Sequence, residues 1–323
     1  MENRQSISVI ICTWNRAASL QATLHSLSEQ KGCENLDIEI IVIDNNSTDD
    51  TKAMVNDILP FWRLGKLRYA FEPRQGKQFA LNHGITIAHG EILAFTDDDI
   101  LFSTDWLCNI ASVFNEEAVE LAGGKTLLIW PDSGKPGWYD LSMMATVAGV
   151  DLGDLKCSPP PPEYAPAGSN MCARGSLFSR VGGFSETHFR HMDYEFGQRC
   201  VRLGVNIAYV PSLVVYAPVA PACLTKRYFR RWSFKAGIAY DGKPDASSAM
   251  LFSVPRWVYR MAFDDLIFLI FRSHGVAEPV VFNHELRLWR CVGMIASRWY
   301  SKYFPGRYSK WVERCSQKKR NLY

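Results

Sequence analysis

The chain has 323 residues, the length of about two domains, and 47% of them are apolar while 21% are charged. This composition excludes disordered and collagen-like proteins. The formal net charge of 36 − 33 = +3 hides two opposite parts. Residues 221–323 carry 19 Lys and Arg against 7 Asp and Glu, a net charge of +12, whereas residues 1–220 carry 17 against 26, a net charge of −9. An acidic body followed by a basic region, which also holds 20 of the 41 aromatic residues, is the first indication of function.

Cysteine usage and apolar runs indicate the compartment. Nine cysteines stand singly, with no CxxC pair, so zinc ribbons and disulfide frameworks are not expected and a reducing compartment fits. The first residues contain too short an apolar run for a signal peptide. The longest uninterrupted apolar run, residues 266–271, has six residues, where a bilayer span needs about twenty. We therefore expect a cytoplasmic protein that does not cross a membrane as a simple helix.

Strand and helix patterns alternate over the first 130 residues, which is typical of a parallel sheet with crossover helices. The polar clusters fall where strands end, and open α/β sheets bind ligands at the carboxyl ends of their strands. The expected strands are residues 8–12, 38–44, 67–71, 91–96 and 119–130, and the expected helices are residues 19–30, 51–59, 78–88 and 106–114.

The rest of the chain is less regular. Residues 131–168 are rich in Pro and Gly and include four consecutive prolines, which indicates a stiff, extended loop that could act as a lid. Helices are expected around residues 175–181 and 192–204, with a short strand at 206–210. From residue 220 onward the pattern predicts helices only, amphipathic and basic.

Three adjacent carboxylates, Asp97, Asp98 and Asp99, directly follow the fourth expected strand. They repel one another unless they are solvated or neutralised by a cation, and at the end of a strand they form a hard-oxygen site suited to Mg²⁺ or Mn²⁺. A solvated loop that caps the next helix is an equally good interpretation. Asp44, at the end of the second strand, likewise either binds a ligand or caps the turn behind it.

Five segments of the sequence, in order, resemble the family 2 glycosyltransferases, which are GT-A-fold enzymes with nucleotide-sugar donors. The segments are SVIICTWNRAASLQATLHSL, IIVIDNNSTDDT, PRQGKQFALNHGI, EILAFTDDDI, and GSNMCARGSLFSRVGGFSE followed by HMDYEFGQRCVRLG. They resemble the opening strand and loop, the strand whose Asp reads the nucleobase, the segment over base and ribose, the DxD motif, and the acceptor-side segment. The resemblance covers roughly residues 7–217.

The resemblance implies an α/β fold with a mostly parallel, nucleotide-sugar-binding sheet and flanking helices, extended by basic C-terminal helices. It implies a GT-A domain over residues 1–219, with a donor half to about 130 and an acceptor half at about 131–219, and a helical region at 220–323. The implied activity is metal-dependent, inverting transfer of a sugar from a nucleotide-diphosphate sugar to a saccharide or lipid-linked saccharide. The expected setting is synthesis of a cell-envelope or exported polysaccharide.

Carried over to this sequence, the roles in donor binding fall on two cations and on polar residues at strand ends. The residues implied to hold the donor are Thr13, Asn15, Asp44, Arg74, Lys77, Asp97 and Asp98. The carboxylate of Asp44 is suited to accept the N–H of uracil or thymine, so a UDP- or dTDP-sugar is expected. Asp99 is implied to bind the Mn²⁺ or Mg²⁺ that bridges the diphosphate, and the run of three Asp leaves open whether Asp98 takes that part. Ordinary surface charge is the alternative for Arg74 and Lys77.

On the acceptor side, Asp193 is implied to be the general base that removes the proton of the attacking hydroxyl. Met192 stands where the family usually has an acid, which suggests a more apolar wall, and Glu195 follows. Asp193 and Glu195 cannot both point the same way at a helix start, so one of them is expected only to cap the helix. A capping carboxylate without a catalytic role is the alternative for Asp193.

The expected metal site departs from the family in one position. Ala217 stands where many members have a His as third metal ligand. Either carboxylates and phosphate alone hold the metal, or His188 or His191 substitutes.

The basic C-terminal region has two candidate roles. Arg227, Arg230 and Arg231 lie in a segment that in many such transferases is near the donor phosphates, and a solvated helix face is the equal alternative. Residues 250–271 predict an amphipathic helix opened by Pro255, with aromatic residues and arginines interleaved. We therefore expect peripheral binding to an anionic membrane surface, on the inner face of the cell membrane, or packing of these helices on the core.

Other functions were weighed against this interpretation. A nucleotidyltransferase usually needs a Gly-rich loop with a basic residue after the first strand, and the sequence TWNRAAS at this place is not such a loop. A dinucleotide-binding dehydrogenase is excluded because no GxGxxG motif follows any expected strand. Nucleic-acid binding would explain the basic region but not the acidic site. The remaining alternative is a catalytically weakened nucleotide-sugar-binding subunit of a polysaccharide synthesis complex, which Ala217 favours and the three Asp oppose.

Overall fold

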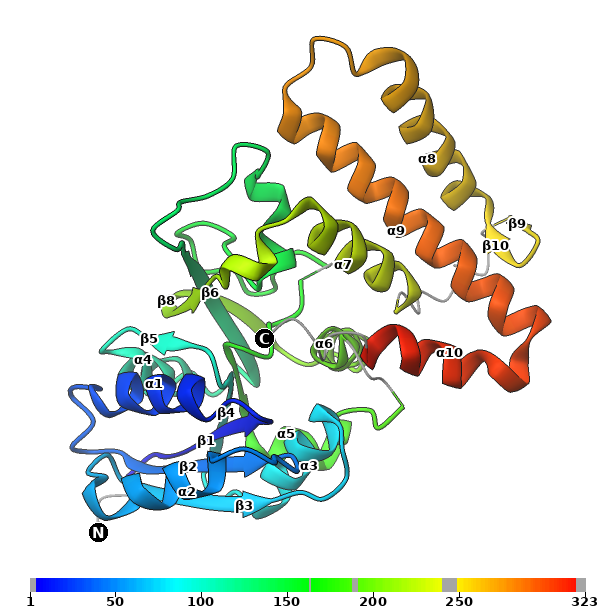
Figure 1. Ribbon diagram of the computed structural model, residues 1–323. Coiled ribbons are helices and arrows are strands. Elements are labelled where there is room, and N and C mark those ends of the chain that lie inside the picture. Colours follow the sequence, from blue (N-terminus) through cyan, green and yellow to red (C-terminus); the bar gives the residue numbers. More distant parts are fainter. Residues whose placement is uncertain (1–3, 163, 188–190, 240–248, 318–323) are drawn as a thin grey trace. The chain divides into compact units, whose positions relative to one another are not determined.

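The computed structural model divides into two compact units (Figure 1). The structure describes residues 4–162, 164–187, 191–239 and 249–317. The first unit comprises Met1–Ile129 and Ala148–Pro218, and the second comprises Trp130–Val147 and Val219–Tyr323. The segment expected to act as a lid is thus shared between the two units, and the lid remains a prediction.

An eight-stranded mixed sheet forms the centre of the first unit, in the order β3-β2-β1-β4-β7-β6-β8-β5. Its strands are β1 (Ser6–Thr13), β2 (Asp37–Asp44), β3 (Lys66–Phe71), β4 (Ile92–Asp97), β5 (Leu101–Phe102), β6 (Leu121–Ile129), β7 (Met171–Arg174) and β8 (Ile207–Pro218). The pairs among β3, β2, β1 and β4 are parallel, as is the pair of β6 with β8. Strands β7 and β5 pair antiparallel with their neighbours. The mostly parallel α/β sheet expected from the sequence is therefore confirmed.

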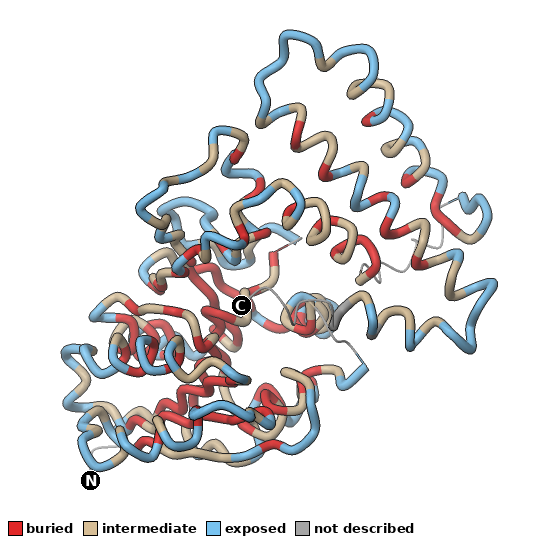
Figure 2. The backbone as a smooth tube through the Cα atoms, in the orientation of Figure 1, coloured by how far each residue is buried: buried red, intermediate tan, exposed pale blue. Residues whose placement is uncertain are grey.

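Helices cover both faces of this sheet because alternate residues of the strands are apolar on both sides. The helices are α1 (Ala17–Ser28), α2 (Thr51–Ile58), η1 (Leu59–Phe61), α3 (Lys77–Ile87), α4 (Trp106–Phe114), α5 (Gly175–Val181) and α6 (Met192–Arg202). In β1, Val9 and Ile11 enter the core under α1, α2 and α4, whereas Ile10 and Cys12 enter the core under α3, α5 and α6. The buried strands stand out in Figure 2.

Three expectations for the strands were wrong. The sequence predicted no strand over Leu101–Phe102 or over Met171–Arg174, and it ended the strand of residues 206–210 too early, because Pro211 and Ser212 interrupt the apolar pattern. Strand β8 instead passes this point where its pairing with β6 shifts register between Gly123 and Lys125. A proline is tolerated at such an irregularity because it has no ladder hydrogen bond to lose.

The second unit is helical apart from one short hairpin. Its elements are η2 (Leu141–Val147), η3 (Pro221–Cys223), α7 (Lys226–Ile238), β9 (Met250–Leu251), β10 (Val254–Pro255), α8 (Arg256–Ile267), η4 (Phe268–Arg272, a π-helix), α9 (Glu278–Tyr303) and α10 (Pro305–Gln317). The hairpin of β9 and β10 corrects the expectation of helices only. Among the described helices, none combines the length and the apolar character that a membrane span needs.

Helix α9 packs against α7 and α8 through two different kinds of contact. Gly237 and Gly293 let the backbones of α7 and α9 approach, since an added Cβ at either would lie 2.1 Å from a carbonyl oxygen of the other helix. Towards α8, the contact is polar: the carboxylate of Asp265 is fully buried and accepts hydrogen bonds from the guanidinium of Arg287, with His284 Nδ1 2.7 Å away. A buried carboxylate is tolerated only with such partners.

Glu39, on β2, links the neighbouring strands at the amino-terminal edge of the sheet in the first unit. Its carboxylate accepts hydrogen bonds from the Ser8 hydroxyl (2.5 Å), the His89 amide (2.6 Å) and the Arg68 guanidinium (2.7 Å). Burial raises the pKa of Glu39, but the bonds from Ser8, His89 and Arg68 together outweigh burial and lower the pKa to about 2.

We predict that Glu39 makes the stability of the protein depend on pH between 4.5 and about 2. Its folded-state pKa lies below the ordinary value of 4.5, so its stabilisation is complete above pH 4.5 and is lost as the pH falls through about 2. Glu39→Gln should lower the free energy of unfolding at neutral pH by about 1–3 kcal/mol and flatten this acid dependence. Urea unfolding across that pH range measures both effects. Glu34→Gln, at an exposed acid, is the control, and equal slopes in all three proteins would contradict the prediction.

Candidate active site

Polar side chains from three neighbouring strands lie at one edge of the sheet. Thr13 ends β1, Asp44 ends β2 and Asp97 ends β4. The parallel register sets Thr13 beside Asp44 and Cys12 beside Asp97. This is the carboxyl edge of the sheet, where ligands bind in open α/β folds.

Arg16, in the loop after β1, neutralises part of the acidic cluster formed by Asp97, Asp98 and Asp99. Its Nη1 donates to Asp98 Oδ1 at 3.0 Å and to Asp99 Oδ2 at 2.7 Å. The hydroxyl of Thr13 donates to the other oxygen of Asp98 at 2.8 Å. Burial raises the pKa of Asp98 to about 6, against the lowering effect of Arg16. Two of the three carboxylates in the cluster are thus paired with the same arginine.

Lys77, the first residue of α3, pairs with the remaining member of the cluster through its Nζ and Asp97 Oδ1. Desolvation, the largest single effect, lowers the pKa of Lys77, but the charge and the hydrogen bond of Asp97, with smaller contributions from Cys12 and Asp193, together outweigh it, and the pKa lies above its ordinary value. Lys77 is therefore held at the carboxyl edge of the sheet chiefly by Asp97.

Asp44 is buried and already holds two local partners. Its Oδ1 accepts the amide of Ser47 at 2.8 Å, and its Oδ2 accepts the hydroxyl of Tyr69 at 2.7 Å. The turn-capping interpretation of Asp44 therefore describes its local structure. Each carboxylate oxygen can accept a further bond, so reading of a nucleobase stays a prediction.

Asn15 joins the first loop to the second. Its backbone has φ of 52°, its amide donates to Ser47 Oγ at 2.9 Å, and its side-chain oxygen accepts the amide of Thr48 at 2.6 Å. Asn tolerates this left-handed conformation better than most residues. Asn15 thus holds the loop after β1 against the loop after β2, which begins behind Asp44.

Asn45 holds the loop that carries Arg74. Its side-chain amide donates to the carbonyl of Arg74 at 2.6 Å, and its oxygen accepts the amide of Gly76 at 2.7 Å. The buried carboxylate of Glu72 accepts from both the amide and the Nε of Arg74, each at 3.0 Å, and the guanidinium lies over the ring of Phe79. Arg74 is therefore a positioned cation, which its interpretation as an ordinary surface charge does not predict.

Asp193 and Glu195 have different partners at the start of α6. Asp193 Oδ2 accepts the amide of Gly168 at 2.9 Å. Glu195 accepts two bonds of 3.0 Å from Arg199, whose other N–H groups donate to the carbonyls of Val181 and Gly183. Glu195 is consequently committed to an ion pair on its own helix.

The positions around Asp193 differ in part from expectation. Met192 is buried in the core under α6, with Phe196, and its part as an apolar wall of the site stays a prediction. His191 begins α6 with φ of 53°. His188 lies outside the described residues, and Ala217 is buried in β8.

The carboxylates of this cluster differ in how accessible they are to a divalent cation. In the part of the chain that the structure describes, no three His, Cys, Asp or Glu side chains converge on a position that could hold a metal ion. The side chain of Asp99 is 45% exposed, against 8% for Asp98, which makes Asp99 the more accessible oxygen donor. Further ligands would have to come from the diphosphate of the donor.

The three arginines expected near phosphate lie on α7 of the second unit. Arg230 is held by Glu285 of α9 through bonds of 2.6 and 3.0 Å, and Arg227 is exposed. For Arg230 the structure supplies a structural partner, and a phosphate role for Arg227, Arg230 or Arg231 stays a prediction.

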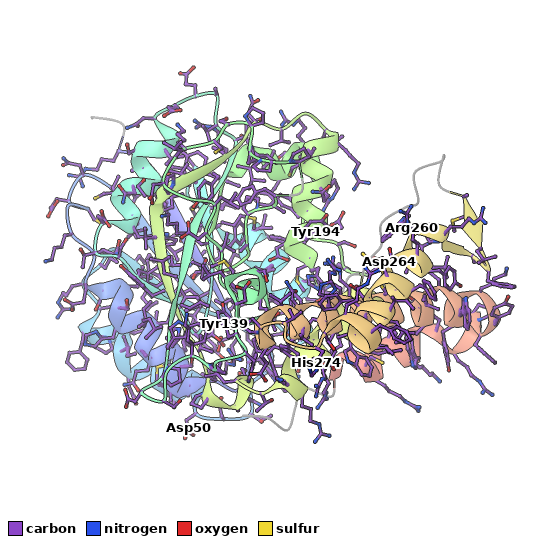
Figure 3. The ribbon with its side chains drawn as sticks, turned by 90° about the horizontal axis from the view of Figure 1, so that it is seen from above. Asp50, Tyr139, Tyr194, Arg260, Asp264 and His274 are labelled. Atoms are coloured by element: carbon purple, nitrogen blue, oxygen red, sulfur yellow. The ribbon has the colours of Figure 1, made fainter. Side chains whose placement is uncertain are left out.

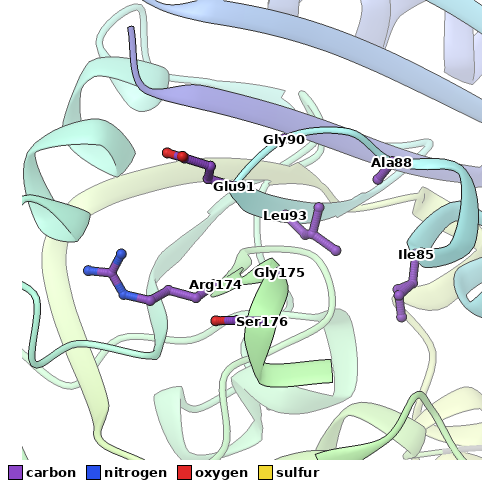
Figure 4. A pocket seen from close by; sticks show the side chains of 8 residues that line it. All are labelled: Ile85, Ala88, Gly90, Glu91, Leu93, Arg174, Gly175 and Ser176. Atoms are coloured by element: carbon purple, nitrogen blue, oxygen red, sulfur yellow. The ribbon is translucent and has the colours of Figure 1, made fainter. Parts of the chain in front are cut away.

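A pocket lies at the opposite end of β4 from the acidic cluster (Figure 4). It is lined by Ile85, Ala88, Gly90, Glu91, Leu93, Arg174, Gly175 and Ser176. The guanidinium of Arg174 is engaged with the carbonyls of Phe114, Glu116 and Val119. The strand ends with their carboxylates, and not this pocket, hold the candidate chemistry.

Comparison with known proteins identifies the family. The model of "Glycosyl transferase family 2" matches residues 8–158, and that of "Glycosyl transferase family group 2" matches residues 92–305. The chain belongs to glycosyl transferase family 2, and it is a nucleotide-sugar-dependent glycosyltransferase.

Individual relatives agree with this assignment. The chain is 31% identical over 230 residues to the glycosyltransferase AglE of Haloferax volcanii, which covers 69% of this chain and 71% of AglE. It is 32% identical over 119 residues to the GalNAc(5)-diNAcBac-PP-undecaprenol beta-1,3-glucosyltransferase of Campylobacter jejuni, over 36% of this chain and 37% of that enzyme. The fold matches the mannosyltransferase PcManGT of Pyrobaculum calidifontis, solved with GDP-Man and Mn²⁺, with a TM-score of 0.56, 18% identity and coverage of 99% and 88%.

Sequence reasoning missed Arg16, Asn45, Tyr69 and Glu72. Arg16 and Asn45 each directly follow an expected site residue, and that adjacency was an available signal. The pairing of Tyr69 with Asp44 arises only from the register of β2 with β3, which places Val42 beside Tyr69.

We predict that Mn²⁺ compensates for the loss of Arg16. Arg16→Gln leaves Asp98 and Asp99 without this cation, so the melting temperature should fall, by an amount equivalent to about 1–3 kcal/mol. Mn²⁺ should raise the melting temperature of this variant more than that of the unsubstituted protein. Arg68→Gln, which breaks the pair with Glu39 at the other edge of the sheet, is the matched control and should not be rescued. Equal Mn²⁺ shifts in the three proteins would refute the prediction.

Proposed function

We propose that this glycosyltransferase inverts the anomeric carbon of a UDP- or dTDP-sugar, with Asp193 as general base and a divalent cation at Asp99. The observation that carries the proposal is the assembly at one edge of the sheet. Thr13, Asp44 and Asp97 end three adjacent strands, and Lys77 pairs with Asp97 at the same edge.

Donor binding is assigned to the loops at this edge. Thr13, Asn15 and Asp44 lie around the position proposed for the base, and the cations Arg74 and Lys77 supply positive charge towards the phosphates. Asp97 and Asp98 are assigned to the ribose or to support of the metal. A bound divalent cation would supply neutralisation of the diphosphate as it leaves.

In the proposed reaction the acceptor hydroxyl gives its proton to the carboxylate of Asp193 while its oxygen forms a bond to the anomeric carbon. The bond from that carbon to the diphosphate oxygen breaks, and its electron pair leaves with the nucleoside diphosphate. One displacement of this kind inverts the carbon. Glu195 is a poorer candidate for the base because Arg199 hydrogen-bonds to both of its carboxylate oxygens.

The acceptor is proposed to be a saccharide or lipid-linked saccharide in polysaccharide synthesis, at the cytoplasmic face of the cell membrane. Support comes from the Campylobacter relative, whose name specifies a lipid-linked saccharide. A nucleotide-sugar-binding subunit with weakened catalysis is the second candidate, favoured by the buried Ala217 in place of a third metal ligand. Donor-dependent release of nucleoside diphosphate, screened over nucleotide sugars with and without Mn²⁺, tests the proposal, and binding without release would favour the second candidate.

We predict that turnover requires a divalent cation and Asp99. Asp99→Ala removes the accessible oxygen donor, so the rate should fall on the order of 10³-fold or more. Asp57→Ala, at an exposed acid on α2, should leave the rate unchanged. Metal affinity should be modest and should rise when nucleotide is present, which calorimetry measures. Full turnover in excess EDTA would refute the prediction.

We predict that Asp193→Asn lowers turnover by roughly 10²–10⁴-fold while donor binding stays nearly intact. The side-chain oxygen of the substituted residue can still accept the hydrogen bond from the Gly168 backbone N–H, but the side chain cannot take the proton of the acceptor hydroxyl. Glu195→Gln should chiefly lower stability, because it weakens the pair with Arg199. Steady-state rates and donor titrations on both variants separate these effects. A crippled Glu195→Gln beside a tolerated Asp193→Asn would show that Glu195 is the base.

A further inference from the structure

Helix α8 carries large apolar side chains on its outward face as well as apolar side chains towards α9. Its inward face holds Val258 with the partly buried apolar residues of the same core cluster, and the buried carboxylate of Asp265. Its outward face and the η4 turn that continues it carry large apolar side chains, with Phe263 62%, Ile270 59% and Phe271 72% exposed. Side chains of this kind are more stable when they are buried than when they are in water. Figure 2 shows the same contrast, with α8 buried at only a few positions along its length.

A second apolar element precedes this face. In the turn between β9 and β10, Phe252 and Ser253 have φ of 47° and 68°, a conformation that is unusual for a bulky residue. Phe252 is 62% exposed, and Met250 and Leu251 are each 43% exposed. The turn thus presents apolar side chains to solvent next to the start of α8.

Arginines accompany these apolar side chains. Arg256 and Arg260 lie one turn apart on the exposed side of α8, and Arg272 closes η4. The exposed acid on this helix is Asp264, which pairs with Arg260 at 4.0 Å (Figure 3). Arg256, Arg260, Phe263 and Ile270 recur at near-helical intervals, so cations and apolar groups share one face.

We propose that this face, defined by Phe252, Arg256, Arg260, Phe263, Leu266, Ile270, Phe271 and Arg272 and called here the α8 face, docks on an anionic lipid surface. Interfacial helices bury one apolar face in the headgroup region and keep cations beside it. The excess of arginine and the net charge of +12 over residues 221–323 attract anionic lipid. The same charge repels a second copy of this surface.

The proposal depends on the proposed function in one respect, that a membrane is where a lipid-linked acceptor is found. Binding to lipid does not itself depend on catalysis. The two can therefore fail separately, provided that lipid binding and release of nucleoside diphosphate are measured on the same preparations.

Vesicle flotation of the full chain tests the α8 face. Phosphatidylcholine vesicles are compared with phosphatidylcholine–phosphatidylglycerol vesicles at low and high salt. We expect binding to the anionic vesicles that weakens with salt. Phe263→Ser with Phe271→Ser should weaken binding roughly tenfold or more. Phe61→Ser with Leu155→Ser, at residues of the first unit that are 77% and 79% exposed, is the matched control and should bind as the unsubstituted protein does.

A second variant tests the charges. Arg256→Gln with Arg260→Gln should weaken binding to anionic vesicles by about fivefold for each arginine, whereas Arg63→Gln with Arg202→Gln, at exposed arginines of the first unit, should not. Recovery of the unsubstituted chain in the soluble fraction with both vesicle types would overturn the proposal. A dimer in light scattering that becomes a monomer in the Phe263→Ser, Phe271→Ser variant would also overturn the proposal, because the α8 face would then bind a second copy of the chain. Release of nucleoside diphosphate without lipid should be equal in the α8-face variants and in the unsubstituted protein.

Discussion

The carboxyl edge of the sheet depends on neutralisation of three adjacent carboxylates. Three carboxylates so close together repel one another unless cations neutralise them. Arg16, from the loop after β1, pairs with Asp98 and Asp99, and Lys77, at the start of α3, pairs with Asp97. Each cation comes from a different crossover of the sheet, so the acidic cluster also fixes these two loops against each other. The site proposed to bind a diphosphate and a cation is thereby preorganised with charges of both signs.

Around this cluster, neutral and acidic side chains position the loops that the proposal assigns to the donor. Asn45 and Glu72 hold the segment of Arg74. The two carboxylates at the start of α6 have different partners. Arg199 binds Glu195, whereas Asp193 accepts a hydrogen bond from the Gly168 amide and contributes to the raised pKa of Lys77. Two acids of one helical turn thus have different environments, which is the physical basis for giving them different roles.

The second unit follows a different principle. Its α7–α9 contact is made by glycines, and its α8–α9 contact centres on the buried charge of Asp265. Phe268 stacks on His284 of α9, whereas Phe263 and Phe271 are exposed. The helix thus keeps an exposed apolar face, and the arginines beside it are the reason for proposing an anionic partner.

The sequence by itself determined the order of the longer strands and helices in the first 130 residues, though not the two-residue β5, because apolar periodicity and strand-end polar residues are local signals. It also determined the family, through five motifs in order. Only the tertiary structure decided that β8 continues past Pro211 and that β7 exists, since both depend on pairing with distant strands. It likewise decided the partners of the site residues. Arg16 with Asp98, Tyr69 with Asp44, and the commitment of Glu195 to Arg199 arise from register and helix orientation, which a pattern along the chain does not contain.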